Sequence, residues 1–363
     1  MSFVPITDNS YINDVRSQSD FKGISFSEFK KTEVKKQFIE AMFKGKIEPA
    51  CYWCVELICA GHFNDLWECI FHYMGKHIHS ANPKIAIYLE KRYEIFENII
   101  KQKYFINEFE LRNNIMIRKL FAEITTILTT SHKKNSFEKV KIIHDDEFDI
   151  TMMSQKLKAS NMSFAEPIFQ EEDPKELFIP INEFAYHISN DTPNMLSACY
   201  WMEWIIEFDA ICRKRKENCF GQRRDFSVEY KYKNDIIWII WDVMKFYSKK
   251  KTQNGAFIES VINSLSNIFC VNYKNSSNKK HKYLLYFAIE LLTENITVGV
   301  EIVNDKNILS NVIEKINNIY KQIKKNENSP NMDYLFSNID ETRNYENTVK
   351  KLELMKSMDF VNF

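Results

Sequence analysis

The sequence predicts an all-α protein made of two related helical-bundle halves and a C-terminal helical extension. The chain of 363 residues has only 7 glycines and 8 prolines, whereas antiparallel sheets and long α/β enzymes need many turn residues. Hydrophobic residues make up 45% of the chain and recur at helical spacing. The sequence Ala-Cys-Tyr-Trp occurs at residues 50–53 and again at 198–201, which indicates an internal duplication.

The first helical unit is expected over residues 24–131, after a flexible N-terminus at residues 1–23. Apolar residues at helical spacing define its helices, and glycines at their ends suit helix C-caps. An Asn-Pro pair supplies a cap and a first turn for the fourth helix. The helices are expected at about residues 33–43, 49–60, 65–75, 83–99 and 107–130.

The second helical unit is expected over residues 176–325 and repeats the first. Its segment 182–188 resembles residues 36–42, and the Ala-Cys-Tyr-Trp sequence follows in both units. The run at 235–250 then matches 65–76 in type, with an aspartate, apolar residues, a tryptophan and a basic end. Further helices are expected at residues 256–269, 282–292 and 309–323.

Two other segments connect or follow the helical units. Residues 132–175 are charged and are expected to form a connector, with one short strand pair as an option. Residues 326–363 are expected to form a linker and a C-terminal helix or tail. The tail contains an amphipathic stretch at residues 341–358, which is either a docked helix or a free end.

The CxxC spacing of Cys51 and Cys54 raises the possibility of a zinc site, completed by a His-x-His pair downstream. However, the motif lies within an expected helix, and the second copy has Met202 in place of the second cysteine. We therefore interpret both copies as core packing, in which a free cysteine behaves as a small hydrophobic residue. The residues assigned to this core motif are Cys51, Tyr52, Trp53, Trp67, Cys199, Tyr200, Trp201 and Trp238.

Composition excludes several classes of function. The charges balance, with 49 basic and 49 acidic residues, so any attraction to nucleic acid must be local. No apolar run is long enough to span a bilayer and no secretory pattern is present, so we expect a soluble intracellular protein with reduced thiols. Phosphate-loop, dinucleotide-binding, GxSxG and HExxH motifs are absent. The chain is therefore expected not to be an enzyme, and no catalytic residue, cofactor or metal is assigned.

A basic insertion at residues 212–234 distinguishes the second unit from the first. Basic residues alternate there with aromatic ones, a pattern that binds phosphates and stacks on bases. A solvated loop, or a loop that docks on an acidic protein surface, would have the same composition. The candidate nucleic-acid or partner-binding residues are Arg213, Lys214, Arg215, Lys216, Arg223, Arg224, Lys231 and Lys233.

Five segments carry a resemblance that covers most of the chain: residues 21–93, 113–124, 148–159, 166–178 and 197–204. They resemble an uncharacterised protein family of large nucleocytoplasmic DNA viruses. The resemblance implies a viral protein made in infected cells, and it assigns no activity.

A local resemblance covers residues 38–83, which are similar to the C-terminal helical collar domain of clamp-loader-like AAA+ ATPases. The resemblance implies an oligomerising helical fold. The family's acidic pair is replaced by His77 and His79, and no ATPase module precedes the helices, so ATP hydrolysis is not implied. The positions that fit are Gly45, Ala50, Tyr52, Trp53, Trp67, Ala81 and Pro83.

Together these observations favour a non-enzymatic helical scaffold or interaction protein of a large DNA virus, acting in replication or transcription complexes. Its expected partners are proteins, with self-association and nucleic acid as further possibilities, and no membrane. The expected location is the host cytoplasm or the viral factory, or else the virion. The alternatives are a virion structural protein and an enzyme whose site the sequence does not reveal.

Overall fold

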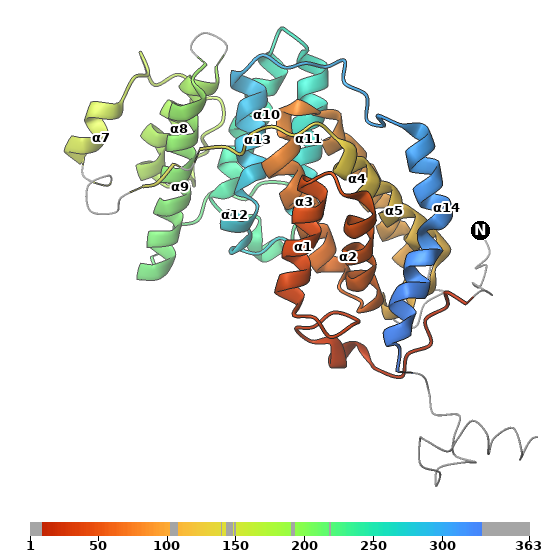
Figure 1. Cartoon of the computed structure of the whole chain (residues 1–363). Helices are drawn as coiled ribbons and strands as arrows, with labels where there is room; N and C mark the ends of the chain where they lie inside the picture. Colours follow the sequence, from red (N-terminus) through yellow and green to blue (C-terminus); the bar gives the residue numbers. More distant parts are fainter. Residues whose placement is uncertain are drawn as a thin grey trace, which may run out of the picture.

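The computed structural model of the chain describes residues 9–101, 108–138, 140–142, 148, 150–189, 193–217 and 219–328. Regular structure in this part is helical, apart from one isolated antiparallel bridge between Ile24 and Lys30 (Figure 1). The prediction of an all-α fold is therefore confirmed. None of the described helices combines the length and apolar character that a membrane span requires.

The described part of the first unit contains five α-helices whose ends are set by local signals. Gly45 and Gly61, which follow α1 and α2, have φ angles of 70° and 73°, a backbone conformation that glycine adopts without steric cost. The side chain of Asn114 caps α5 by accepting from the N–H groups of Met116 and Ile117. The helices are α1 (Lys31–Phe43), α2 (Ile47–Cys59), α3 (Phe63–Tyr73), α4 (Lys84–Lys101) and α5 (Ile115–Thr130).

The second unit shows a similar order of helix packing. In the first unit α1 packs against α2 and α3, and α5 contacts both α1 and α2. In the second unit α8 packs against α9 and α10, and α13 contacts both α8 and α9. The internal duplication itself stays a prediction. The helices are α8 (Phe178–Ile188), α9 (Met195–Arg215), α10 (Ile237–Lys250), α11 (Gly255–Cys270), α12 (Ser277–Lys280) and α13 (Lys282–Thr293).

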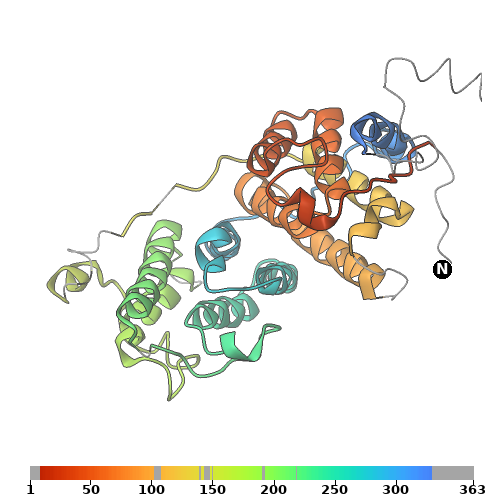
Figure 2. The ribbon, with the colours of Figure 1, turned by 90° about the horizontal axis from the view of Figure 1, so that it is seen from below.

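The two units meet along α4 and α11, which pack against each other, and along α13, which contacts α3 and the turn that follows it. Figure 2 shows the two groups of helices side by side. Asn267 on α11 donates a hydrogen bond to Glu90 on α4 at 2.5 Å. Buried apolar residues of both units belong to one continuous core, so the units share their hydrophobic stabilisation.

The helix α14 (Lys306–Ile323) packs on α2 and α5 of the first unit, although it follows the second unit in sequence (Figure 1). Its Tyr320 ring lies 3.7 Å from the guanidinium of the buried Arg118, which also donates to the carbonyl of Ser10 at 2.9 Å. The assignment of this helix to the second unit is therefore corrected. The expectation of a flexible N-terminus is wrong from residue 9 onward, because Ile12 is buried in the core.

The described part of the connector contains α7 (Ile150–Lys156) and no strand, so the optional strand pair is wrong there. Side chains of α8 take the hydrogen bonds that a strand partner would make. Glu183 accepts from two backbone N–H groups of the connector, and Asn182 accepts from two others. The stretch 341–358 lies outside the described residues.

Candidate functional site

The insertion at residues 212–234 is packed onto the second unit as a folded-back loop. Its two arms are joined where the N–H of Gly221 donates to the carbonyl of Asn234 at 2.9 Å. Within it, the buried ring of Phe226 stacks on Trp238 of α10, with centroids 4.5 Å apart. The contact buries an aromatic face that would otherwise be available to stack on a base.

Arg224 fastens the insertion to two other segments through charge-assisted hydrogen bonds. Its guanidinium donates to both carboxylate oxygens of Asp173 in the connector, at 2.9 and 2.6 Å. Its Nε donates to Asp242 on α10 at 2.6 Å. Burial raises the pKa of the Asp242 carboxyl, and the adjacent Arg224 opposes that shift. The fork geometry of arginine suits this two-sided pairing.

Arg213 makes a second internal ion pair at the end of α9. Its Nε lies 2.9 Å from Asp209 on the same helix, and its terminal nitrogen lies 3.0 Å from Asp235. The hydroxyl of Tyr273 donates to the other oxygen of Asp235 at 2.8 Å. Burial raises the pKa of Asp209, against the effect of Arg213. These contacts connect α9 with the loops on either side of α10 and α11.

Arg213 and Arg224 were predicted as partner-binding residues. Arg224 is buried and Arg213 is partly exposed, and both pair with carboxylates of the chain itself. Their acidic partners, which are Asp209, Asp235, Asp173 and Asp242, were not predicted from the sequence. One signal was present: Asp235 and Asp242 flank the apolar run at residues 236–241. A carboxylate beside a buried helix needs a cationic partner or a loss of charge.

Five of the other predicted residues are exposed. Lys233 is an exception, because its ammonium group lies 2.9 Å from Asp225 and its side chain is about a quarter exposed. Two carboxylates reduce the local positive charge: Glu217 lies 3.9 Å from Arg215, and Glu229 lies 2.7 Å from a lysine. The exposed basic residues are Lys214, Arg215, Lys216, Arg223 and Lys231.

Two exposed aromatic rings belong to the same insertion as these cations. Phe220 is 46% exposed and Tyr230 is 65% exposed. The guanidinium of Arg223 lies 4.2 Å from the Tyr230 ring centroid and donates to its hydroxyl. A cavity of about 470 Å³ adjoins Phe220 and Arg223. We call Lys214, Arg215, Lys216, Arg223, Phe220 and Tyr230 the basic surface.

The residues of the repeated Cys-Tyr-Trp motif lie in or against the core. Burial raises the pKa of the Cys51 thiol to about 12 and raises that of Cys54 further, and both thiols lie on α2 within the core. The buried members of the motif are Cys51, Trp67, Cys199, Trp201 and Trp238. The partly buried members that pack against the core are Tyr52, Trp53 and Tyr200.

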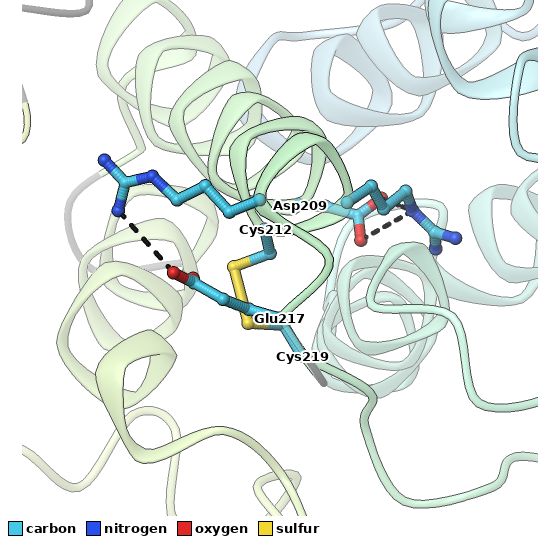
Figure 3. The surroundings of a disulfide bond; sticks show 6 residues. Asp209, Cys212, Glu217 and Cys219 are labelled. Atoms are coloured by element: carbon cyan, nitrogen blue, oxygen red, sulfur yellow. Dashed lines mark hydrogen bonds and ion pairs between the residues drawn. A yellow bond between two sulfur atoms is a disulfide. The ribbon is translucent and has the colours of Figure 1, made fainter.

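Cys212 and Cys219 form a disulfide at the start of the insertion (Figure 3). The expectation of reduced thiols is wrong for this pair. The six other cysteines are free and buried, in agreement with that expectation. Proximity of the paired residues arises because α9 ends between them and the chain turns back.

His79 and Glu290 form a buried hydrogen-bonded pair between the two units. The Nδ1 of His79 lies 2.8 Å from Glu290, and its Nε2 lies 3.1 Å from the carbonyl oxygen of Asn135. Ser80 and Lys134 donate to the second oxygen of Glu290 at 2.6 and 2.7 Å. Both ring nitrogens therefore lie within hydrogen-bonding distance of oxygen atoms of the protein.

The backbone around His79 is unusual. A π-helical turn, Met74–Ile78, precedes it, and His79 itself has a φ of 31°. A cavity of about 280 Å³ borders the pair. Strained conformations of this kind persist where surrounding contacts fix them. Here the fixed contacts fasten the connector to α13.

A cavity of about 610 Å³ lies between α3 and the loop that follows α11. Three carboxylates (Asp65, Glu68 and Glu229) and a histidine line it, but lysines already bind the carboxylates, with Lys231 lying 2.7 Å from Glu229. Lys35 lies 2.9 Å from Asp65 and 3.3 Å from Glu68, and Lys280 lies 3.4 Å from Glu68. Burial lowers the pKa of His281. We therefore place the candidate site at the basic surface rather than in this cavity.

Comparison with known proteins finds no match for this chain among family models, curated proteins or solved structures.

Proposed function

We propose that this chain is a non-enzymatic helical interaction protein that contacts nucleic acid through its basic surface. The observation that supports this proposal is that some basic residues of the insertion pair with carboxylates of the chain, whereas others are exposed. Arg213 and Arg224 pair with carboxylates of the chain itself, while two aromatic rings and five other cations stay exposed on the same insertion, one of them, Lys231, beside Glu229. Positioning by buried pairs lowers the entropic cost of binding at an exposed surface.

The exposed groups suit a flexible polyanion. Lysine and arginine neutralise phosphates with release of counterions, and an aromatic ring stacks on any unpaired base. The ion pair between Arg215 and Glu217 is exposed and 3.9 Å long, so it contributes at most about 1 kcal/mol and yields readily to a phosphate. Single-stranded DNA or RNA is therefore the expected class of partner.

The test measures binding to single-stranded DNA and RNA across a series of salt concentrations. We expect a variant with Lys214, Arg215, Lys216 and Arg223 changed to glutamate to lose this binding. If each residue contacts one phosphate, the slope of log K against log salt falls by about 3. Arg213 and Arg224 are left unchanged so that the fold is retained.

The control reverses four exposed lysines elsewhere, on α4, α5 and α14. It has the same net charge as the test variant and should bind as the wild type does. Equal loss in both variants would show a general charge effect and overturn the assignment to the basic surface. Absence of wild-type binding at low salt would overturn the function itself. The control residues are Lys91, Lys119, Lys306 and Lys315.

The resemblance to proteins of large nucleocytoplasmic DNA viruses suggests where such binding would act. We propose replication or transcription complexes of infected cells. Mass spectrometry of purified virions tests this, since stoichiometric abundance there would instead favour a structural role in the particle.

A further inference from the structure

The disulfide between Cys212 and Cys219 encloses half of the basic surface. The two residues are seven positions apart, with Cα atoms 6.1 Å apart, a separation within the normal range for disulfides. Lys214, Arg215 and Lys216 lie between the two cysteines in sequence and therefore within the loop that the bond closes. We call these three residues the basic turn.

The end of α9 gives the basic turn a defined shape. Lys216 adopts the left-handed conformation, with a φ of 58°, and its N–H donates back to the carbonyls of Arg213 and Cys212. The N–H of Glu217 also donates to the Cys212 carbonyl, at 3.0 Å. A lysine in this conformation carries a steric cost. The disulfide supports that conformation by holding residue 219 against the last turn of the helix.

The pair differs in chemistry from the other cysteines of the chain. The free cysteines are buried, and burial raises the pKa of Cys51 and Cys69 to about 12 and that of Cys270 to about 11. Thiols of this kind stay protonated and exchange slowly. Cys219, in contrast, is only partly buried on a surface loop. An oxidant or a reductant in solution therefore reaches this pair first.

We propose that Cys212 and Cys219 are a reversible thiol–disulfide modification site that sets the shape of the basic turn and thereby its affinity for polyanions. The part about affinity rests on the proposed function. The oxidised form, with the turn closed, is the form that binds. Reduction opens the loop, and the three cations become free to move apart, which raises the entropic cost of holding them on one partner.

The modification needs a thiol oxidant such as a small-molecule disulfide. The thiolate of one cysteine attacks the oxidant and releases one thiol. The second cysteine then attacks the mixed disulfide, which forms the Cys212–Cys219 bond and releases the second thiol. Two protein thiols lose two electrons and two protons, and the oxidant gains both. A dithiol reductant reverses each step.

The first experiment reads the bond without any partner. The wild type is equilibrated in glutathione buffers of graded redox ratio, and free thiols are then alkylated in denaturant and counted by mass spectrometry. We expect one cysteine pair to change state with the ratio, and peptide mapping to identify it as Cys212 and Cys219. A Cys270→Ala variant should behave identically. No cross-link under oxidising buffers would overturn the proposal.

Trypsin gives an independent readout, because the exposed basic turn supplies its cleavage sites. After cleavage there, the oxidised protein should run as one species on a denaturing non-reducing gel, and as two after reduction. The Cys219→Ser variant should give two species in both cases. Faster cleavage in the reduced wild type than in the oxidised wild type is expected from the open loop. Equal rates would contradict a change in shape.

Binding is measured last, on oxidised and reduced wild type and on Cys219→Ser. Reduction should weaken binding to single-stranded DNA about fivefold in 0.1 M salt, the effect of losing one phosphate contact. The variant should bind like the reduced form under both conditions. A reversible bond without any DNA binding would reject the proposed function and leave the modification site standing. Unchanged affinity in all states would reject the control of binding.

The remaining alternative is that Cys212 and Cys219 bind zinc instead of forming a reversible disulfide. The Glu217 carboxylate lies close enough to both sulfur atoms to join them as a ligand set, and thiolates with a carboxylate suit zinc. Reduced protein incubated with zinc alone and then desalted should contain no stoichiometric metal. Retention of one zinc per chain, lost in Cys219→Ser, would replace the redox site with a metal site.

Discussion

Arg223 and Arg224 are neighbours in the chain, yet only Arg224 is buried. Both are arginines in the same stretch of sequence, so the difference in their burial comes from the residues that the fold places beside each of them. Arg224 meets Asp173 from the connector and Asp242 from α10, whereas Arg223 meets a tyrosine ring at the surface. Removing a partner from a buried pair is costly, whereas removing an exposed cation is nearly neutral.

An Arg224→Met variant should therefore lose about 3–5 kcal/mol of unfolding free energy, because the buried carboxylate of Asp173 and the partly buried carboxylate of Asp242 lose their partner. The adjacent Arg223→Met variant is the matched control and should change it by less than about 0.5 kcal/mol. Urea unfolding followed by circular dichroism measures both. Equal effects of the two substitutions would contradict the assignment of Arg224 as an internal brace.

Glu290 should make stability depend on pH. Desolvation by burial would raise its pKa, but the hydrogen bonds from His79, Lys134 and Ser80 outweigh that effect and hold the pKa below the ordinary value of 4.5. A carboxyl with a lowered folded-state pKa stabilises the protein above its unfolded-state pKa, and this contribution is lost as the pH falls through the folded-state value.

We therefore expect Glu290→Gln to cost about 3 kcal/mol at neutral pH. The difference from wild type should shrink as the pH is lowered below about 4.5. The exposed Glu294, one turn further along the chain, supplies the control as Glu294→Gln. Urea unfolding at a series of pH values measures the difference. A gap between wild type and Glu290→Gln that stays constant down to low pH would refute the assignment.

At the scale of elements, α14 shows how a helix of strong amphipathic pattern is placed by distant partners. Its buried residues are Ile316, Tyr320 and Ile323. They pack on α2 and α5 rather than on the unit that precedes them in sequence. The N-terminal segment joins the same assembly, since the N–H of Val15 donates to the carbonyl of Asn328 at 3.0 Å.

A Tyr320→Ala variant should open this assembly locally. Loss of the buried ring leaves a cavity and removes the stacking partner of Arg118, at a cost of about 3 kcal/mol. Hydrogen exchange should rise in α14 and in residues 9–16, and stay unchanged in α8 and α9. Ile308→Ala, on the same helix but 40% exposed, should leave exchange as in the wild type. Equal acceleration throughout the chain would instead indicate one cooperative unit.

At the scale of the whole molecule, the two units are held by contacts that do not depend on the connector. The pairing of α4 with α11, the contacts of α13 with α3, and the return of α14 to the first unit all cross between them. The buried pair of His79 and Glu290 adds a polar contact at the same boundary. One continuous core joins both halves.

A chain cut in the connector should therefore stay assembled. A protease site inserted after Ile142 would allow cleavage of the folded protein, and the two fragments should elute together in size-exclusion chromatography. Urea should separate them. Separation of the fragments in native buffer would show that the connector, and not the shared core, keeps the units together.

The sequence by itself determined the helices and much of the core. Helical spacing of apolar residues, the glycines after α1 and α2, and the Asn-Pro pair before α4 are local signals, and their effect is complete within one or two turns. For the same reason the repeated Cys-Tyr-Trp motif was interpreted as packing before its surroundings were known. The boundaries of α5 and α14 differed from expectation by several residues, since caps and fraying decide them.

Only the tertiary structure decided which charges are internal, where α14 docks and which cysteines meet. Arg224 and Asp173 are 51 positions apart, and His79 and Glu290 are 211 apart. No local pattern encodes such pairs, because each depends on how several helices pack together. Even Cys212 and Cys219, only seven positions apart, meet because α9 ends between them and the insertion is held back by Arg213. A continued helix would have carried the two sulfur atoms about a further turn apart.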